Sequence, residues 1–297
     1  MRALGTLGLL ALLGSCAAPE ATPVHQPGLE NAYWITDSVL SGAQPEGEAA
    51  FRELAALGVK TVISVDGATP DVETARRCGL RYVHIPIGYD GVPQERALEL
   101  AKAIRELDGP LYVHCHHGQH RGPAAAVVAC VVAGTMDNAR AVETMKTLGT
   151  GPQYIGLWES ARQAKKAEAA TLRGLQVEFR EKAPIPPLAE AMVSLDVVTE
   201  RLQLCAKAGW KQPAGHPDLD PAHEALRVRE ILAEIMRTEE FRSRPEDFRR
   251  KMEASRAVSE RLETLLRAGD PAAPAFAALK ESCADCHKPY RNTRPRK

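Results

Sequence analysis

The sequence has few aromatic residues and no net charge of either sign. Phe, Trp and Tyr make up 5% of its 297 residues, while small residues, above all Ala, are abundant. This mix favours close-packed helices and short α/β units over an all-β sandwich. The 38 basic residues balance the 38 acidic ones, so nothing indicates a nucleic-acid partner and we expect none. A chain of this length is too long for one ordinary core and predicts two domains.

The N-terminus has the pattern of an export signal. A positive charge is followed by residues 3–13, a mostly apolar run that is too short to span a bilayer. The run leads into Leu-Gly-Ser-Cys at residues 13–16, which resembles the lipobox of bacterial lipoproteins. The resemblance implies removal of residues 1–15 and lipidation of Cys16; the alternative is a plain secretory signal with an incidental cysteine. Residues 16–30 are expected to be a flexible tether, so we predict an exported protein anchored by lipid to a bacterial membrane and facing the periplasm.

Residues 31–183 are predicted to form one α/β domain. A hairpin is expected around Thr36-Asp37-Ser38, with buried strands over 59–65, 82–87 and 111–114. Helices are predicted over 46–57, 70–78, 93–107, 123–133, 137–148 and 153–169. Because strands alternate with helices, we expect a mostly parallel sheet with helices on both faces. Residues 161–182 are rich in Ala, Lys, Glu and Arg and are expected to form a solvated helical face.

Residues 184–297 are predicted to form a second, all-α domain. Prolines at 184, 186 and 187 interrupt any helix and mark the boundary. Four amphipathic patterns follow, separated by turn signals, which favours a four-helix bundle. The apolar stripe of the first helix includes Met192.

The most informative segment is residues 114–122, His-Cys-His-His-Gly-Gln-His-Arg-Gly, between a buried strand and an apolar helix. Successive backbone N–H groups in such a loop form an anion-binding nest, and the helix N-terminus adds positive potential. The same field favours the thiolate form of Cys115, while Arg121 can bind two phosphoryl oxygens. The other residues expected to line the phosphate-binding nest are His116, His117, Gly118, Gln119, His120 and Gly122. A nucleophile, a nest and a guanidinium are what phosphomonoester transfer requires.

This segment resembles the His-Cys-(five residues)-Arg signature of the cysteine-based protein tyrosine and dual-specificity phosphatases. The resemblance covers about residues 31–150 and includes an opening hairpin at 36–45 and an acid-bearing loop at 85–90. It implies that Cys115 is the nucleophile of a phosphocysteine mechanism, that Arg121 binds the phosphate and that Asp90 is the general acid. It also implies that the phosphatase site needs no metal. Asp90 as a simple turn residue is the alternative.

Gly122 departs from the family pattern, which usually has Ser or Thr directly after the arginine. That hydroxyl helps the thiolate leave when the phosphocysteine breaks down, so we expect phosphate binding to survive and the second step to be slow. Two other interpretations of the loop are a rhodanese-like sulfur-transfer site and a metal cluster. The metal cluster would use the four histidines of the segment, His114, His116, His117 and His120.

Cys283-Ala284-Asp285-Cys286-His287 is a C-x-x-C-H motif, the attachment site of c-type haem. On a helix Cys283 and His287 lie one turn apart, so two thioethers can form while His287 binds the iron. The placement resembles the cytochrome c′ and c-556 family over residues 186–293. That resemblance implies a covalent haem c, attached outside the cytoplasm, with Met192 as a candidate second axial ligand or as core filler. A zinc site and a redox dithiol are the alternatives.

These motifs predict an exported phosphomonoester hydrolase joined to a c-type haem redox or sensor domain. Its substrate would be a phosphorylated protein or small molecule, and the haem would serve an electron-transfer partner. The alternative is a haem redox or gas-binding protein whose phosphatase-like domain only binds a phosphorylated ligand. Cys78, Cys130 and Cys205 remain, and buried free thiols are expected there rather than a disulfide.

Overall fold

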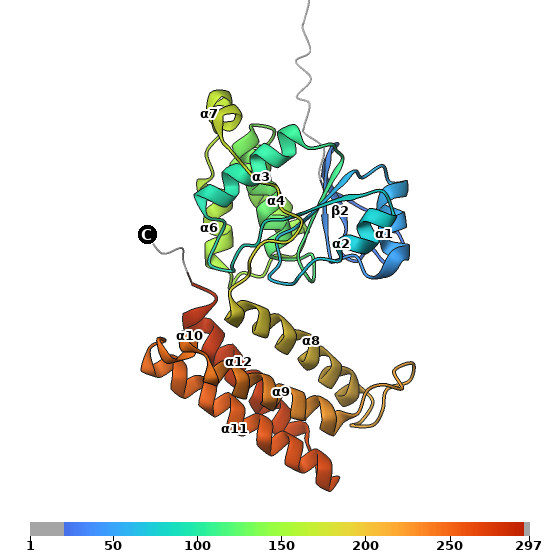
Figure 1. The fold of residues 1–297 in the computed structure, drawn as a ribbon, viewed down its shortest axis with the longest axis vertical. Helices are drawn as coiled ribbons and strands as arrows, with labels where there is room; N and C mark the ends of the chain where they lie inside the picture. Colours follow the sequence, from blue (N-terminus) through green and yellow to red (C-terminus); the bar gives the residue numbers. More distant parts are fainter. Residues whose placement is uncertain (1–20, 294–297) are drawn as a thin grey trace, which may run out of the picture.

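The computed structural model describes residues 21–293 as an α/β region followed by a helical region (Figure 1). The expected signal peptide at 1–15 and the lipidation site Cys16 lie outside the described residues, so both stay predictions. No helix within residues 21–293 is long and apolar enough to cross a membrane.

The α/β region is built on one six-stranded mixed sheet. Its strands are β1 (Thr22–Pro23), β2 (Tyr33–Thr36), β3 (Val39–Gly42), β4 (Thr61–Ser64), β5 (Arg81–His84) and β6 (Leu111–His114). They lie in the order β1-β2-β3-β6-β4-β5. β1, β2 and β3 pair antiparallel, whereas β3-β6, β6-β4 and β4-β5 pair parallel. The carboxyl ends of β4 and β6 therefore meet at the same edge of the sheet.

Helices cover both faces of the sheet, as predicted. They are α1 (Gly47–Ala56), α2 (Val72–Arg77), α3 (Gln94–Glu106), α4 (Arg121–Ala133), α5 (Asn138–Thr147), α6 (Ile155–Gln163) and α7 (Ala169–Gly174). Side chains of β6 alternate between two apolar clusters: Leu111 and Val113 pack with α3 to α6, while Tyr112 packs with α1 and α2. This alternation follows from the two-residue period of a strand and places α4 directly after β6.

Two segments differ from the sequence-based expectations. Part of the expected tether is structured, because Thr22 and Pro23 of β1 pair with β2. The helical face expected over 161–182 forms only in part: α6 ends at Gln163, α7 covers Ala169–Gly174, and residues 175–183 run without helix past β5. The N–H of His84 donates to the carbonyl of Arg180 at 2.8 Å, and the N–H of Ala183 donates to Nδ1 of His84 at 3.1 Å. The segment thus satisfies polar groups at a sheet edge that a helix would leave unpaired.

The helical region follows Pro186 and contains four long helices and one short one among the described residues. They are α8 (Pro187–Lys207), α9 (Pro221–Arg237), α10 (Glu239–Arg242), α11 (Glu246–Ala268) and α12 (Ala273–Tyr290). Their apolar faces share one core that includes Val198, Leu232, Leu262 and Phe276. The all-helical prediction for this region is confirmed. Figure 1 shows α8 next to the α/β region.

Candidate functional site

The loop between β6 and α4 carries the candidate phosphate-binding residues. Cys115 follows β6 directly and is buried, and α4 begins at Arg121, two residues earlier than predicted. Carbonyls of the loop accept hydrogen bonds from outside it. The carbonyl of His116 accepts from the N–H of Gln44 at 3.0 Å, and that of His117 accepts from Nδ2 of Asn31 at 2.9 Å. These bonds fix the peptide planes of the loop.

Four backbone N–H groups of the same loop have no acceptor among the described residues. Within residues 21–293, those of His117, Gly118, Gln119 and His120 donate to no backbone or side-chain acceptor. Buried or partly buried N–H groups normally have a partner. Consecutive free donors at a helix N-terminus are the arrangement that binds an anion.

Two glycines allow the loop its close contacts. Gly118 has φ +68°, and a Cβ there would lie 2.2 Å from the backbone N of Ala43. Only glycine fits such a conformation and contact. A Cβ at Gly122 would lie 3.1 Å from the backbone N of Cys115. A Ser or Thr at that position would therefore have to displace the backbone of Cys115 slightly.

Arg121 is held by Asp66, a residue that sequence analysis missed. Both side chains are buried, and Nη2 of Arg121 donates to Oδ2 of Asp66 at 2.7 Å. The same Oδ2 accepts the N–H of His116 at 2.7 Å. Nε of Arg121 is buried and has no partner among the described residues. Asp66 thus fixes the guanidinium through Nη2, and the buried Nε–H is among the N–H groups that remain for a ligand.

The electrostatics of this pair are those of a buried ion pair. Burial alone would raise the pKa of Asp66, but the Arg121 guanidinium and the His116 N–H lower it below its ordinary value. Burial alone would lower the pKa of Arg121, and the carboxylate of Asp66 instead raises it. Both groups are therefore charged throughout the neutral range.

The predicted acid loop contributes an aromatic side chain as well. The guanidinium carbon of Arg121 lies 4.4 Å from the ring centre of Tyr89, and that of Arg291, from the end of α12, lies 4.7 Å from it. Both distances are in the range of cation–π contacts. Tyr89 therefore links the phosphate loop to the helical region, a role that sequence analysis did not assign.

Asp90, the predicted general acid, lies on the same loop. A Cβ at Gly88 would lie 2.3 Å from Oδ1 of Asp90, so the carboxylate turns back towards its own loop. A Cβ at Gly156 would lie 1.9 Å from the carbonyl oxygen of Asp90, which shows that α6 packs against this loop. The role of Asp90 as acid stays a prediction.

The four histidines of the segment do not form one cluster. His114 is buried and its Nε2 lies 2.6 Å from the hydroxyl of Tyr82, and burial lowers its pKa to about 4. His120 accepts the N–H of Gly151 at 3.3 Å through Nδ1, and burial lowers its pKa to about 4. Both are neutral at pH 7. Among the described residues His116 and His117 belong to a group of potential metal ligands and His114 and His120 do not, so the four-histidine metal cluster is not formed.

The C-x-x-C-H motif lies on α12. Cys283, Cys286 and His287 are half-buried, and both cysteines are free thiols packed against the helical core. Burial lowers the pKa of His287 to about 4, so its imidazole is neutral and able to bind a metal at pH 7. Met192 packs against the same core from α8. Two thiols and a neutral imidazole on one face of a helix fit the donor set of a c-type haem.

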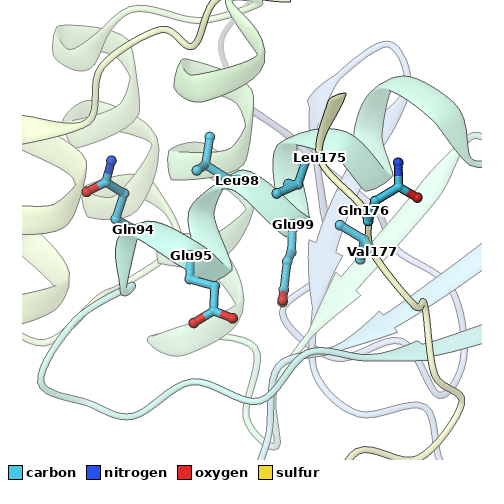
Figure 2. Close-up of a pocket in the computed structure, with 7 residues that line it drawn as sticks. All are labelled: Gln94, Glu95, Leu98, Glu99, Leu175, Gln176 and Val177. Carbon is cyan, nitrogen blue, oxygen red and sulfur yellow. The ribbon is translucent and has the colours of Figure 1, made fainter. Parts of the chain in front are cut away.

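The remaining cysteines are free thiols: Cys78 is half-buried, and Cys130 and Cys205 are buried. A surface cavity also lies away from the phosphate loop, between α3 and the segment after α7 (Figure 2). Glu95 and Glu99 of α3 line it together with Leu175 and Val177 of the segment after α7. It contains no cysteine or histidine.

The N-terminal region is a mixed α/β fold with an anion-binding loop between β6 and α4. No family profile matches the chain. Among curated proteins, the dual specificity protein phosphatase TpbA of Pseudomonas aeruginosa strain UCBPP-PA14 is 27% identical over 218 residues, covering 70% of this chain and 91% of the relative. The N-terminal region therefore resembles TpbA-type phosphatases, and this homology supports a phosphatase.

Solved structures give matches to the same region. The crystal structure of P. aeruginosa TpbA is 24% identical, with a TM-score of 0.40, over 53% of this chain and 91% of the other. Human DUSP28 is 19% identical, with a TM-score of 0.37, over 48% of this chain and 98% of the other.

Proposed function

We propose that the chain is a phosphomonoester hydrolase of the protein tyrosine and dual-specificity type. One observation carries the proposal: a buried thiol, four free N–H groups and the guanidinium of Arg121 belong to one short loop. A phosphate dianion would accept hydrogen bonds from the N–H groups and the guanidinium at once, with the sulfur of Cys115 beside it. The homology to TpbA supports the same reaction, and a crystal structure of TpbA contains phosphotyrosine.

In the proposed reaction, the thiolate of Cys115 attacks phosphorus and the bond from phosphorus to the leaving oxygen breaks. Asp90 gives its proton to that oxygen, which then leaves as an alcohol or a phenol. Water next attacks the phosphocysteine, its proton passes to the carboxylate of Asp90, and the sulfur–phosphorus bond breaks. The products are inorganic phosphate and the regenerated thiolate. Arg121 and the loop N–H groups bind the equatorial oxygens in both steps.

Asp66 is a positioning residue in this scheme. Its carboxylate orients Arg121 and the first peptide N–H of the loop through two 2.7 Å hydrogen bonds. Nε of Arg121 has no partner among residues 21–293. The guanidinium is therefore oriented by Asp66 and still has an N–H group that can donate to phosphate. Such a preorganised donor is what transition-state stabilisation requires.

We further propose that Cys283 and Cys286 hold a covalent haem c and that His287 is its proximal ligand. When bound, the haem supplies one-electron redox chemistry or gas binding. The half-buried side chains on α12 support this, and Met192 of α8, which packs against the same core, would be a second candidate to bind the iron. Attachment of such a haem outside the cytoplasm agrees with the proposed lipid anchor at Cys16 and a periplasmic location. An electron-transfer partner is part of the same proposal.

The test uses the full-length, haem-loaded chain in detergent with para-nitrophenyl phosphate, following the initial burst and the steady state. We expect sustained turnover that is lost in Cys115→Ser and kept in the matched control Cys78→Ser. Unchanged hydrolysis in Cys115→Ser would overturn the proposal.

Gly122 favours one second candidate, a phosphate-binding module with impaired turnover. The hydroxyl that helps the phosphocysteine break down in the phosphatase family is missing at Gly122. A Cβ at this position would lie only 3.1 Å from the backbone N of Cys115, which leaves little room for a Ser or Thr side chain. A burst of about one equivalent of released para-nitrophenol per chain, with no steady-state turnover after it, would indicate a trapped phosphocysteine. No burst, with phosphate still bound, would make the loop a binding module and the haem the functional centre.

A further inference from the structure

Four potential metal ligands meet between the phosphate loop and α8. They are His116 and His117 of the loop and Asp196 and Glu200 of the helix, and their ligand atoms all lie within 4.8 Å of one another. The two elements are far apart in the sequence, so only the packing of the helical region on the α/β region brings them together. A Cβ at Gly67 would contact Val193 at 3.5 Å, which places α8 across this edge of the sheet.

The distances in this cluster leave room for a shared ion. Nε2 of His116 and Nε2 of His117 each lie 3.4 Å from a carboxylate oxygen of Glu200, and Nε2 of His117 lies 3.8 Å from Oδ2 of Asp196. Charge-assisted hydrogen bonds are shorter, about 2.7–2.9 Å. Ligand atoms about 2.0–2.1 Å from a tetrahedral Zn²⁺ are about 3.3–3.4 Å apart. The two separations from Glu200, each measured to a different oxygen of its carboxylate, are close to that edge length, and all four ligand atoms lie within 4.8 Å of one another.

Both pairs of ligands are held in place. Asp196 and Glu200 are four residues apart in α8, so they lie on the same helix face. The backbone N–H of His116 is bonded to Asp66 and its carbonyl to Gln44, and the carbonyl of His117 is bonded to Asn31. A preformed ligand set lowers the ordering cost of binding an ion.

We propose that His116, His117, Asp196 and Glu200 form a Zn²⁺ site that links the phosphate loop to the helical region. Two imidazoles and two carboxylates are ligands that Zn²⁺ accepts, and four protein ligands make a closed, structural type of site. The bound ion would hold α8 against the loop that carries Cys115. We therefore expect Zn²⁺ to inhibit hydrolysis by restricting access to the loop.

The test measures Zn²⁺ bound to the full-length, haem-loaded chain by equilibrium dialysis with metal analysis. We expect one site per chain. The double variant Asp196→Asn with Glu200→Gln should weaken it by more than the roughly 10- to 100-fold that losing an outer-shell partner costs. Glu190→Gln, an exposed carboxylate on the same helix, is the matched control and should bind as the parent does. Circular dichroism checks that each variant is folded.

Cys115→Ser separates this site from zinc binding at the catalytic thiol. Binding kept in Cys115→Ser and lost in the double variant supports the proposal. The reverse pattern, loss in both variants, or no Zn²⁺ binding at all overturns it. Because binding is measured without substrate, the result is independent of whether the loop hydrolyses phosphate. Inhibition by Zn²⁺ should also disappear in the double variant.

Discussion

The two candidate sites of this chain are built in different ways. In the phosphate loop, buried polar groups are already organised by the chain itself: Arg121 by Asp66, and the loop carbonyls by neighbouring segments. On α12, by contrast, Cys283, Cys286 and His287 are half-buried side chains on a regular helix. Their function as a haem site depends on a group that bonds to them.

The difference teaches where each chemistry resides. The proposed phosphate recognition depends mainly on backbone shape, so it requires only that the sheet and α4 are folded. Haem attachment is a property of side-chain chemistry at a fixed spacing, so it depends on two thiols and an imidazole rather than on an unusual backbone.

The largest effect is expected at the helical site. Cys283→Ala with Cys286→Ala removes both thiols that would form thioethers, so covalently bound haem should be lost completely. Haem staining of a denaturing gel measures this directly. Cys205→Ala, a buried thiol in the same helical region, is the control and should keep the haem. Haem that stays attached in the double variant would contradict the assignment of the motif.

In the phosphate loop, Arg121→Lys should lower kcat/KM by about 100- to 1,000-fold. Lysine keeps the charge but loses the planar pair of N–H donors, and loss of one transition-state donor costs about that factor. The assay is steady-state hydrolysis of para-nitrophenyl phosphate. Arg105→Lys, which replaces a guanidinium bonded to the carbonyl of Ala133, is the control. A loss below tenfold at Arg121 would argue against bidentate phosphate binding.

Asp66→Asn tests whether the loop is organised before substrate binds. The variant leaves the Arg121 charge buried without its carboxylate, and breaking a buried pair in this way costs about 3–5 kcal/mol. The free energy of unfolding, measured with urea, should fall by about that amount, and kcat should fall with it. Added inorganic phosphate should stabilise the variant less than the parent, because the guanidinium that binds it is no longer oriented. Equal effects of phosphate on both proteins would refute the positioning role.

Much of this site follows from the sequence, and the part that does not is non-local. The strand before Cys115 and the apolar helix after Arg121 are each visible in a short window, so the loop between them is predictable. Asp66 is 55 residues from its partner Arg121. Their contact depends on β4 lying beside β6, a strand order that no local pattern encodes.

The non-helical course of residues 175–183 beside β5 was missed for a similar reason. Residues 161–182 have a helical composition, yet the part after α7 is not helical because it bonds to His84 beside β5. Composition reports what a segment can do alone, whereas the unpaired groups of a distant strand decide what it does in the fold. The contact of α8 with His116 and His117 is likewise tertiary.

The α/β region should lose stability in weak acid. His114 and His120 have pKa values lowered to about 4 by burial, whereas an unfolded histidine titrates near about 6.5. Between these pH values the unfolded chain binds more protons than the folded chain. The free energy of unfolding therefore has its highest value above about pH 6.5 and falls as the pH drops towards 4. The limit is about 1.4 kcal/mol per pH unit for each histidine.

Urea unfolding at pH 7, 6 and 5, followed by circular dichroism, measures this dependence. His114→Gln should reduce the slope of the free energy of unfolding against pH by the contribution of one histidine. His216→Gln, in an exposed loop of the helical region, is the control. An unchanged slope in His114→Gln would show that its buried neutral form does not drive the acid sensitivity.

The smallest effect is expected where the two regions meet. Arg291 follows the haem motif, and its guanidinium carbon lies 4.7 Å from the ring centre of Tyr89 and 5.7 Å from that of Tyr154. Arg291→Ala removes both contacts, and exposed cation–π pairs contribute about 0.5–1 kcal/mol each. The free energy of unfolding should therefore fall by about 1 kcal/mol, whereas Arg291→Lys should lose less because it keeps a cation.

Because Arg121 contacts the same Tyr89 ring, a change in KM for aryl phosphate in Arg291→Ala would show that the helical region acts on the phosphate loop. A variant with unchanged stability and unchanged KM would show that the two sites work separately.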